Sequence, residues 1–342
     1  MVSTRRFLYL DCLRGVAMIM VVYAHVLSFM LDGITPSPFG QYMRDIMLPL
    51  FFFISGFCAY KKDKTHDYLE LFKQIKGKVK QIFIPTITIF LFFIMYSGQD
   101  ILTVVFNYDK SGYWFTWVLF QIFLIYIVTD FVCSKFSKQW LKFFITVSPV
   151  FLLPIVFHFI GYTNDAASLF EYIKVVGFYF FFLAGVLVKW FEPKIYRLLS
   201  NNYVSTLLLI TSVVTYNWLK LTGGVLLIFN ILLWWLVFRE LECFFSKPSN
   251  KITMILSLIG KNTLAIYFIH FFLLFRMPSC VPEYLASLNG DHCFGTHSCS
   301  SLPELLIVGL VSLILCYACI IIKKIVILFP LISKICFGIY KK

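Results

Sequence analysis

The chain has 342 residues, of which 60% are hydrophobic and only 14% are charged, and its mean hydropathy is +0.85. A soluble domain carries about 25% charged residues, so this composition excludes a soluble globular protein. The net charge of +13 would suggest a nucleic-acid partner in a soluble protein, but Lys and Arg also collect in the cytoplasmic loops of membrane proteins. We therefore expect an all-α polytopic protein of the lipid bilayer that binds no nucleic acid.

The first apolar stretch is a membrane span that carries three ionisable groups. Residues 6–30 are long enough to cross a bilayer as a helix, and they include Asp11, Arg14 and His25. At about 100° per residue, Arg14 and His25 fall within roughly 20° of the same face, and Asp11 can pair with Arg14 at i,i+3. Charges inside membrane helices are expensive, so these three residues are candidates for a functional site.

Apolar runs of membrane-crossing length recur along the whole chain. We expect ten such helices, near residues 7–30, 42–60, 81–97, 113–133, 141–160, 170–189, 203–219, 222–239, 255–275 and 303–322. With a cytoplasmic N-terminus, the segments predicted inside hold 23 Lys and Arg, and those predicted outside hold 3. This asymmetry follows the positive-inside rule and places both termini in the cytoplasm. Residues 325–340, interrupted by Lys334, form an interfacial helix or a short extra span.

The second span and the segment after it contain small and basic residues. Ser55-Gly56, in MLPLFFFISGFCAY, permits the close approach of another helix or of a ligand. The loop predicted over 61–80 is strongly basic and includes Lys76, Lys78 and Lys80. These lysines serve either as a topology determinant in contact with lipid headgroups or as a platform for the phosphates of a cytosolic donor.

Aromatic and charged residues lie at the predicted outer ends of two later spans. Trp114 and Trp117 begin the fourth span, where they form part of an aromatic belt or stack on a sugar. Glu171 and Lys174, near the outer end of the sixth span, have the spacing of an i,i+3 ion pair.

The ninth predicted span, near 255–275, has the second dense polar set, in LSLIGKNTLAIYFIHFFLLFR. It places Tyr267 and His270 deep in the membrane. His270 is either hydrogen-bonded between helices or a substrate contact.

Three cysteines, Cys280, Cys293 and Cys299, lie in the predicted outer loop 276–302 together with two histidines. Their spacing matches no structural zinc pattern, so we expect no metal site. A disulfide is favoured over zinc, and three cysteines leave its pairing unassigned.

Five stretches resemble, in order, the motifs of the acyltransferase-3 family of integral membrane acyltransferases. The first is LDCLRGVAMIMVVYAHV, in which Arg14 and His25 are separated by ten residues as in the family. The others are LPLFFFISGF, the basic stretch Lys76 to Pro85, YWFTWVLFQI and LSLIGKNTLAIYFIHFFLL. The resemblance spans residues 5–325. Lysines replace the arginines that are frequent before the proline, and an ammonium group does not form the bidentate phosphate contact of a guanidinium.

This resemblance implies transfer of an acyl group, most often acetyl, from cytosolic acyl-CoA to a hydroxyl of a glycan. The glycan would be an O-antigen (lipopolysaccharide), capsule or exopolysaccharide unit, and the enzyme would lie in a bacterial inner membrane. We expect one acyltransferase domain over 1–342, without the extracytoplasmic esterase-like domain of some relatives.

Each candidate residue then has an expected part in the reaction. His25 is the general base or a transient carrier of the acyl group, because imidazole suits proton transfer near neutral pH. Arg14 anchors a phosphate of acetyl-CoA or holds the site's geometry, and Asp11 orients Arg14. The further candidates are Lys76, Lys78 and Lys80 for the donor, and Ser55, Trp114, Trp117, Tyr267 and His270 for the substrate.

Two other classes of protein were compared with the acyltransferase. A transporter or glycan flippase would also have many helices with buried charges, but the two halves of the chain show no convincing repeat, and His25 lies away from the midplane. A structural scaffold would explain the Asp11–Arg14 pair, but it would give His25 no role.

Overall fold

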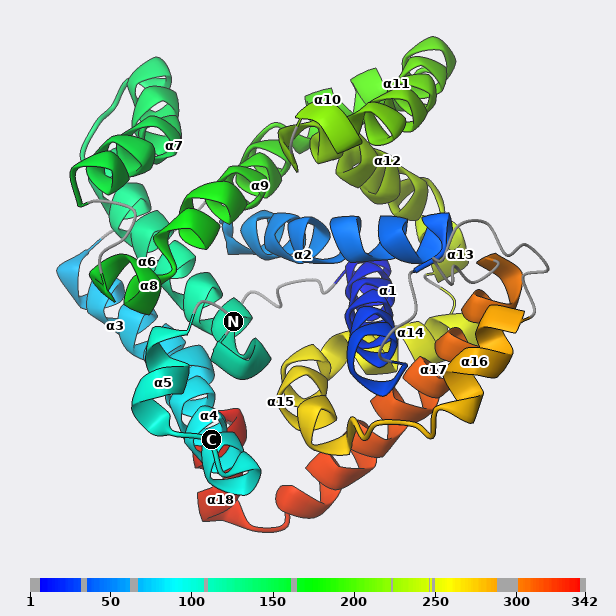
Figure 1. Cartoon of the computed structure of the whole chain (residues 1–342). Helices are drawn as coiled ribbons and strands as arrows, with labels where there is room; N and C mark the ends of the chain where they lie inside the picture. Colours follow the sequence, from blue (N-terminus) through cyan, green and yellow to red (C-terminus); the bar gives the residue numbers. More distant parts are fainter. Residues whose placement is uncertain are drawn as a thin grey trace. The chain divides into compact units, whose positions relative to one another are not determined.

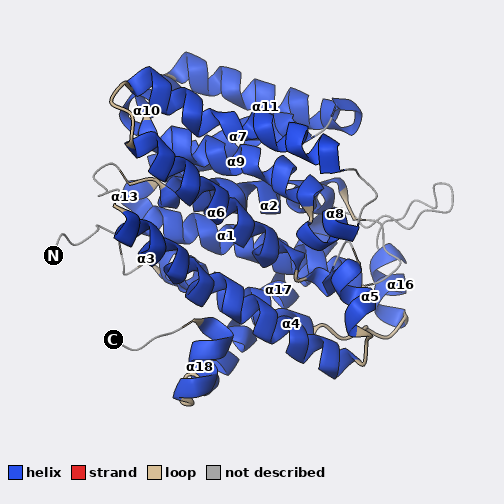
Figure 2. Cartoon of the chain, turned by 90° about the vertical axis from the view of Figure 1, so that its left-hand side faces the viewer, coloured by secondary structure: helices blue, strands red, loops and turns tan. Residues whose placement is uncertain are grey.

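The computed structural model describes residues 7–31, 36–61, 67–107, 110–160, 165–222, 224–245, 247, 250–287 and 301–338. These residues are almost entirely helical, and no β-strand occurs among them (Figure 2). The chain is an all-α polytopic membrane protein, which confirms the predicted fold class.

Seven of the described helices are long and apolar enough to cross a membrane: Leu8–Met30, Pro38–Ala59, Tyr68–Ser97, Trp114–Ser134, Gln139–Val156, Ala167–Trp190 and Leu302–Val326. Two bent helix pairs raise the possible number of spans to nine. The eighth predicted span, near 222–239, corresponds to α12 (Leu227–Glu240), whose 14 residues are fewer than a membrane-crossing helix needs. The number of spans and the cytoplasmic location of the termini stay predictions.

The chain divides into two compact units. Unit 1 comprises residues 1–54 and 193–324, and unit 2 comprises residues 55–192 and 325–342. The helices of unit 1 are α1 (Leu8–His25) with the π-turn η1 (Val26–Met30), most of α2 (Pro38–Ala59) and of α10 (Glu192–Leu199), α11 (Asn202–Thr222), η4 (Gly224–Leu226), α12, α13 (Glu242–Phe245), α14 (Lys251–Lys261), α15 (Thr263–Leu273), α16 (Cys280–Ser287) and most of α17 (Ser301–Val326). Those of unit 2 are α3 (Tyr68–Lys78), η2 (Val79–Phe83), α4 (Ile84–Ser97), α5 (Ile101–Phe106), η3 (Lys110–Gly112), α6 (Trp114–Ser134), α7 (Gln139–Ile160), α8 (Asp165–Phe170), α9 (Tyr172–Trp190) and α18 (Pro330–Phe337).

Helix α1 is buried along most of its length in unit 1 and packs most extensively against α14 (Figure 1). Two glycines allow this packing. A side chain at Gly15 would overlap the carbonyl of Leu256, and one at Gly260 would overlap the carbonyl of Asp11. The backbones of α1 and α14 therefore meet directly, as small residues permit in membrane helices.

The prediction of one uninterrupted helix near 255–275 is corrected by the structure. The structure has two helices instead, α14 and α15, which meet at Asn262 and are bent by 81°. Asn262 leaves the helical region at φ −115° and ψ 13°, and its side-chain amide donates to the carbonyl of Leu258. Asn readily satisfies nearby backbone groups in non-helical conformations, so the apolar run is interrupted although its hydropathy is continuous.

The prediction of a basic loop over 61–80 is wrong for residues 68–80, which are helical. Residues Tyr68–Ser97 form one continuous helical segment, α3 through η2 to α4, that is long enough to cross a membrane. Asp67 caps its start by accepting from the backbone N–H of Tyr68, and charged and apolar residues alternate at helical spacing in α3. The lysines before Pro85 are thus arranged on a helix, where a loop was expected.

Close helix packing also occurs at two glycines of unit 2. At Gly56, in the part of α2 that belongs to this unit, a side chain would overlap the carbonyl of Phe182 on α9, which confirms the predicted close helix approach. In the apolar segment 325–340, the short helix α18 packs against α4, and Gly338 meets the backbone at Lys80.

Candidate active site

The acid–base pair predicted on α1 is present. An oxygen of Asp11 lies 3.7 Å from Nη1 of Arg14, across one turn of the helix. The Asp11 side chain is only 2% exposed, whereas that of Arg14 is 31% exposed. The buried carboxylate therefore balances a guanidinium whose other face is accessible to a ligand.

At the other end of α1, His25 forms a pair with His270 of α15. Nδ1 of His25 lies 2.8 Å from Nε2 of His270, and the rings stack with their centroids 4.9 Å apart. His270 is fully buried, while His25 is partly exposed. The bend at Asn262 gives α15 its own direction next to α1, and the two helices contact each other.

The hydrogen-bond partners assign the protons on both rings. Nδ1 of His270 lies 3.0 Å from the carbonyl oxygen of Ile266, and a carbonyl only accepts, so this nitrogen carries the proton. With both rings neutral, Nε2 of His270 then accepts from Nδ1–H of His25. The remaining nitrogen, Nε2 of His25, holds a lone pair and has no hydrogen-bond partner among the described residues. It is a proton acceptor on the exposed side of the pair.

Aromatic rings surround this histidine pair. Phe271 lies 4.9 Å from the His25 ring and 4.1 Å from the His270 ring, and Phe29 lies 5.8 Å from His25. Tyr267, one turn before His270, is 4% exposed and contacts the His270 ring at 5.9 Å. This apolar enclosure limits water around the pair, which strengthens its electrostatic interactions.

The charged pair and the histidine pair lie at opposite ends of α1. Arg14 and His25 are eleven positions apart, so about 16 Å of helix lies between them. The structure thus brings Asp11 and Arg14 together, and it pairs His25 with His270, whose ring Tyr267 contacts. A ligand that touches both pairs must be elongated.

The other candidate residues belong to unit 2 and are described within it. Nζ of Lys78 lies 3.4 Å from the centre of the Phe123 ring, while Lys76 is exposed. The Trp114 ring stacks on Phe178 and has the ammonium group of Lys174 at 4.2 Å. Ser55 and Lys80 are partly exposed.

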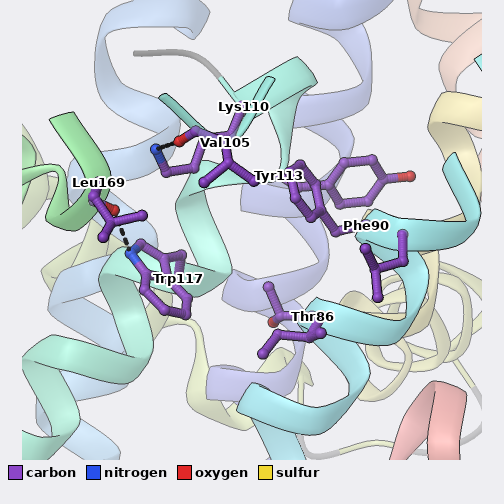
Figure 3. A pocket seen from close by; sticks show the side chains of 9 residues that line it. Thr86, Phe90, Val105, Lys110, Tyr113, Trp117 and Leu169 are labelled. Carbon is purple, nitrogen blue, oxygen red and sulfur yellow. Dashed lines mark hydrogen bonds between the residues drawn. The ribbon is translucent and has the colours of Figure 1, made fainter. Parts of the chain in front are cut away.

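Trp117 lines a cavity of about 220 Å³ whose walls are almost wholly apolar (Figure 3). Phe90 of α4 and Tyr113 contribute further aromatic wall. The indole N–H of Trp117 donates to the carbonyl of Leu169 at 3.1 Å, so it is occupied by the protein itself. The ring can still contact an apolar ligand, but it cannot use this N–H to bind one.

A buried charge cluster of unit 2, Lys110, Glu171 and Lys174, extends the predicted Glu171–Lys174 pair. Glu171 is fully buried, with Nζ of Lys174 at 3.1 Å and Nζ of Lys110 at 3.2 Å. Lys110 also donates to the carbonyls of Val105 and Ser168. Lys110 and Glu171 both adopt positive φ angles, 41° and 54°, which side-chain-bearing residues rarely do.

Sequence reasoning missed Glu304, a fully buried acid in the first turn of α17. The hydroxyl of Tyr23 donates to its Oε1 at 2.7 Å, and the backbone N–H of Ser37 donates to its Oε2 at 2.7 Å. The carboxylate thereby links α1, the start of α2 and α17. The sequence shows an acid at the edge of an apolar run, but it does not show that Tyr23 and Ser37 hydrogen-bond to this acid.

Replacing this carboxylate tests its contribution to stability. We expect Glu304→Gln to lower the free energy of unfolding by about 1–3 kcal/mol, because one amide group cannot accept from both donors. Tyr23→Phe, which removes one hydrogen bond, should cost about 1 kcal/mol. Thermal unfolding of the purified protein measures both, with the exposed acid variant Glu283→Gln as control. A Glu304→Gln protein as stable as the control would contradict the assignment.

The cysteine prediction is only partly within the described residues. Cys280 is an exposed free thiol at the start of α16. Cys293 and Cys299 lie outside the described residues, so the disulfide stays a prediction.

Comparison with known families identifies the class of protein. The acyltransferase-3 family model, an acyltransferase domain, matches residues 7–321. This match covers α1 with both of its ionisable pairs and extends into α17. The chain belongs to the acyltransferase-3 family, and it is an integral membrane acyltransferase. Searches of curated proteins and of solved structures find no match.

Proposed function

We propose that the protein is an O-acyltransferase that moves an acetyl group from cytosolic acetyl-CoA to a hydroxyl of a cell-surface or lipid-linked glycan. Membership of the acyltransferase family supports the reaction class. The observation that carries the proposal is the partly exposed Nε2 of His25, held as a proton acceptor by the pairing of Nδ1 with His270. A hydroxyl becomes a competent nucleophile only when such a group takes its proton.

In the proposed reaction, Nε2 of His25 takes the proton of the acceptor hydroxyl as the hydroxyl oxygen attacks the thioester carbonyl. The carbon–sulfur bond then breaks, and the imidazolium of His25 returns the proton to the departing thiolate. The products are the O-acetyl ester and the free thiol, so atoms and charge balance. His270 keeps the His25 ring in the tautomer and orientation that this exchange requires.

The proposal includes a second possible role for Nε2 of His25. His25 could carry the acetyl group transiently, because imidazole is also a nucleophile. In this version Nε2 attacks the thioester carbonyl, the carbon–sulfur bond breaks and the CoA thiolate leaves. The glycan hydroxyl then attacks the acyl-imidazolium, the nitrogen–carbonyl bond breaks, and the hydroxyl proton passes to the thiolate, so the products are the same ester, free thiol and neutral His25. Both versions need Nε2 unprotonated and partly exposed.

The remaining candidate residues receive proposed contacts. Arg14, held by Asp11, would bind a phosphate group, since guanidinium favours such anions. Lys76, Lys78 and Lys80 are one candidate set of donor contacts, although the ammonium of Lys78 already faces Phe123. Ser55, Trp114, Trp117 and Tyr267 are proposed substrate contacts. The membrane would be the inner membrane of a bacterium, and the glycan an O-antigen, capsule or exopolysaccharide unit.

Mass spectrometry of surface glycans, with and without the gene, tests this function directly. Loss of one acetyl mass per repeating unit in the deletion strain, restored by the gene, is the expected result. Identical glycans in both strains would overturn the glycan assignment.

His270 offers a test of the positioning argument. We expect His270→Leu to lower kcat by about 10²-fold with little change in KM, because removing the acceptor of Nδ1–H frees the wrong tautomer of His25. His270→Gln, whose amide oxygen can accept the same hydrogen bond, should recover part of the activity. Steady-state kinetics of both variants measure this. Equal activity of His270→Leu and His270→Gln would show that His270 only fills space.

A further inference from the structure

A second cavity, of about 520 Å³, runs along α14 in unit 1. Most of its lining belongs to α14 itself, and Leu8 of α1 and Tyr317 of α17 complete the apolar walls. It is larger than the almost wholly apolar cavity beside Trp117, and polar groups form a larger part of its walls.

Two lysines line this cavity from opposite ends of α14. Lys251 begins the helix and Lys261 ends it, so about 15 Å of helix separates them. Both are exposed, and neither has an ion-pair partner among the described residues. The helix KITMILSLIGK contains no acid. The cavity therefore presents two ammonium groups that form no ion pair among the described residues, which is the chemistry that recognises phosphate groups.

A buried hydroxyl of the same lining also lacks a partner. Thr253 is 1% exposed, and its Oγ1 makes no hydrogen bond to the described residues. Leaving a buried hydroxyl unsatisfied is unfavourable, so such a group is expected to meet a ligand or water. Its O–H is a donor suited to an anionic oxygen. Ser257, which also lines the cavity, has its own hydroxyl donated to the carbonyl of Met254.

The Lys261 end of the cavity adjoins the charged pair on α1. Gly260, next to Lys261, lies against the carbonyl of Asp11, and the charge of Lys261 acts on Cys12. Arg14 is one turn further along α1, with part of its guanidinium accessible. From there α1 continues for about 16 Å to His25.

We propose that this cavity, through Lys251, Lys261 and the hydroxyl of Thr253, binds the phosphate groups of the acyl-CoA donor. The inference rests on the proposed acyl-CoA-dependent reaction and assigns that donor a site. Lys251 lies in the segment 239–255, which the distribution of Lys and Arg predicts to be cytoplasmic, the side from which acyl-CoA comes. The long pantetheine arm of acyl-CoA, which joins the diphosphate to the thioester, is the elongated group needed between the Arg14 end of α1 and His25.

Phosphate groups also occur on anionic phospholipids, so the experiment must separate the two sources. The full chain is reconstituted in nanodiscs of phosphatidylcholine, and the binding of acetyl-CoA is measured by equilibrium dialysis without any acceptor. Acetylpantetheine, which has the thioester and no phosphate, is the matched probe. The variants are Lys251→Gln, Lys261→Gln and Thr253→Val. The control is Lys324→Gln, which removes an exposed lysine of α17 in the same unit.

We expect each lysine variant to raise the Kd for acetyl-CoA about tenfold and the double variant to raise it further, because each removes one charge-assisted contact. Thr253→Val should raise the Kd several-fold. Binding of acetylpantetheine should not change in any variant, and the control should bind both probes like the wild type.

Three results would overturn the assignment. The first is an unchanged Kd for acetyl-CoA in both lysine variants. If Lys80→Gln raises this Kd instead, the phosphate groups bind at the basic helix of unit 2. The second is an equal loss of acetylpantetheine binding, which would indicate a collapsed site. The third combines two measurements. If native mass spectrometry shows phosphatidylglycerol adducts that are lost in the lysine variants, while acetyl-CoA binding is the same in all variants, the cavity binds a lipid headgroup. Because no acceptor is present, these outcomes are independent of whether a glycan is acetylated.

Discussion

His25→Ala should lower acetyl transfer by about 10²–10⁴-fold, the range that a positioned general base contributes. His25 supplies the partly exposed Nε2 of the histidine pair, and His270, buried and donating Nδ1–H to Ile266, cannot replace it. The measurement is the initial rate of acetyl transfer in membranes that contain equal amounts of each variant.

The matched control for this variant is His158→Ala, which removes an exposed histidine of α7 in unit 2. It should keep wild-type activity. Wild-type activity in His25→Ala would refute both forms of the proposed mechanism. Incubating the wild type with labelled acetyl-CoA and no acceptor then separates these forms, since label bound to His25 indicates an acyl carrier and its absence indicates a general base.

The second large effect is expected from removing Glu171. This acid is fully buried between Lys110 and Lys174, whose side chains are 7% and 12% exposed. Burial lowers the pKa of Lys110, and the charge of Glu171 acts in the opposite direction. Glu171→Gln leaves two positive charges close together without a counter-charge, so we expect a loss of about 3–5 kcal/mol in the free energy of unfolding.

Thermal or denaturant unfolding of the purified protein measures this loss. The matched control is Glu70→Gln, which removes the acid of the Glu70–Lys73 pair, where the lysine side chain is 80% exposed. That exposed pair should contribute less than about 1 kcal/mol. Equal stability of the two variants would mean that the Glu171 cluster contributes no more than a surface pair. The acetyltransferase proposal does not depend on this result.

Local features of the sequence predicted several parts of the structure correctly. The pair Asp11–Arg14 followed from spacing alone, because residues three apart on a helix share one face whatever surrounds the helix. The pair Glu171–Lys174 was predicted from the same spacing and is present, although Glu171 precedes α9 with a positive φ. The close helix approach at Gly56 followed from a missing side chain. The membrane class followed from composition, since apolar runs of such length have no other stable environment.

Failures arose where a local conformational preference competed with hydropathy. Apolar character continued through residues 255–275, but Asn262 interrupts the helix there and bends it by 81°. Lysine density suggested a loop over 61–80, but the apolar residues of α3 recur at helical spacing and Asp67 caps the helix. Hydropathy measures the affinity of a segment for the bilayer and contains no information on where its backbone bends.

By itself, the sequence determined that this is a helical membrane acyltransferase with Arg14 and His25 along one helix. Only the tertiary structure decided that His25 pairs with His270, that Glu304 links three helices, and that Lys251, Lys261 and Thr253 line one cavity. The physical reason is separation along the chain. His25 and His270 are 245 residues apart, and a hydrogen bond between such distant groups depends on how α1, α14 and α15 pack, which no local spacing encodes.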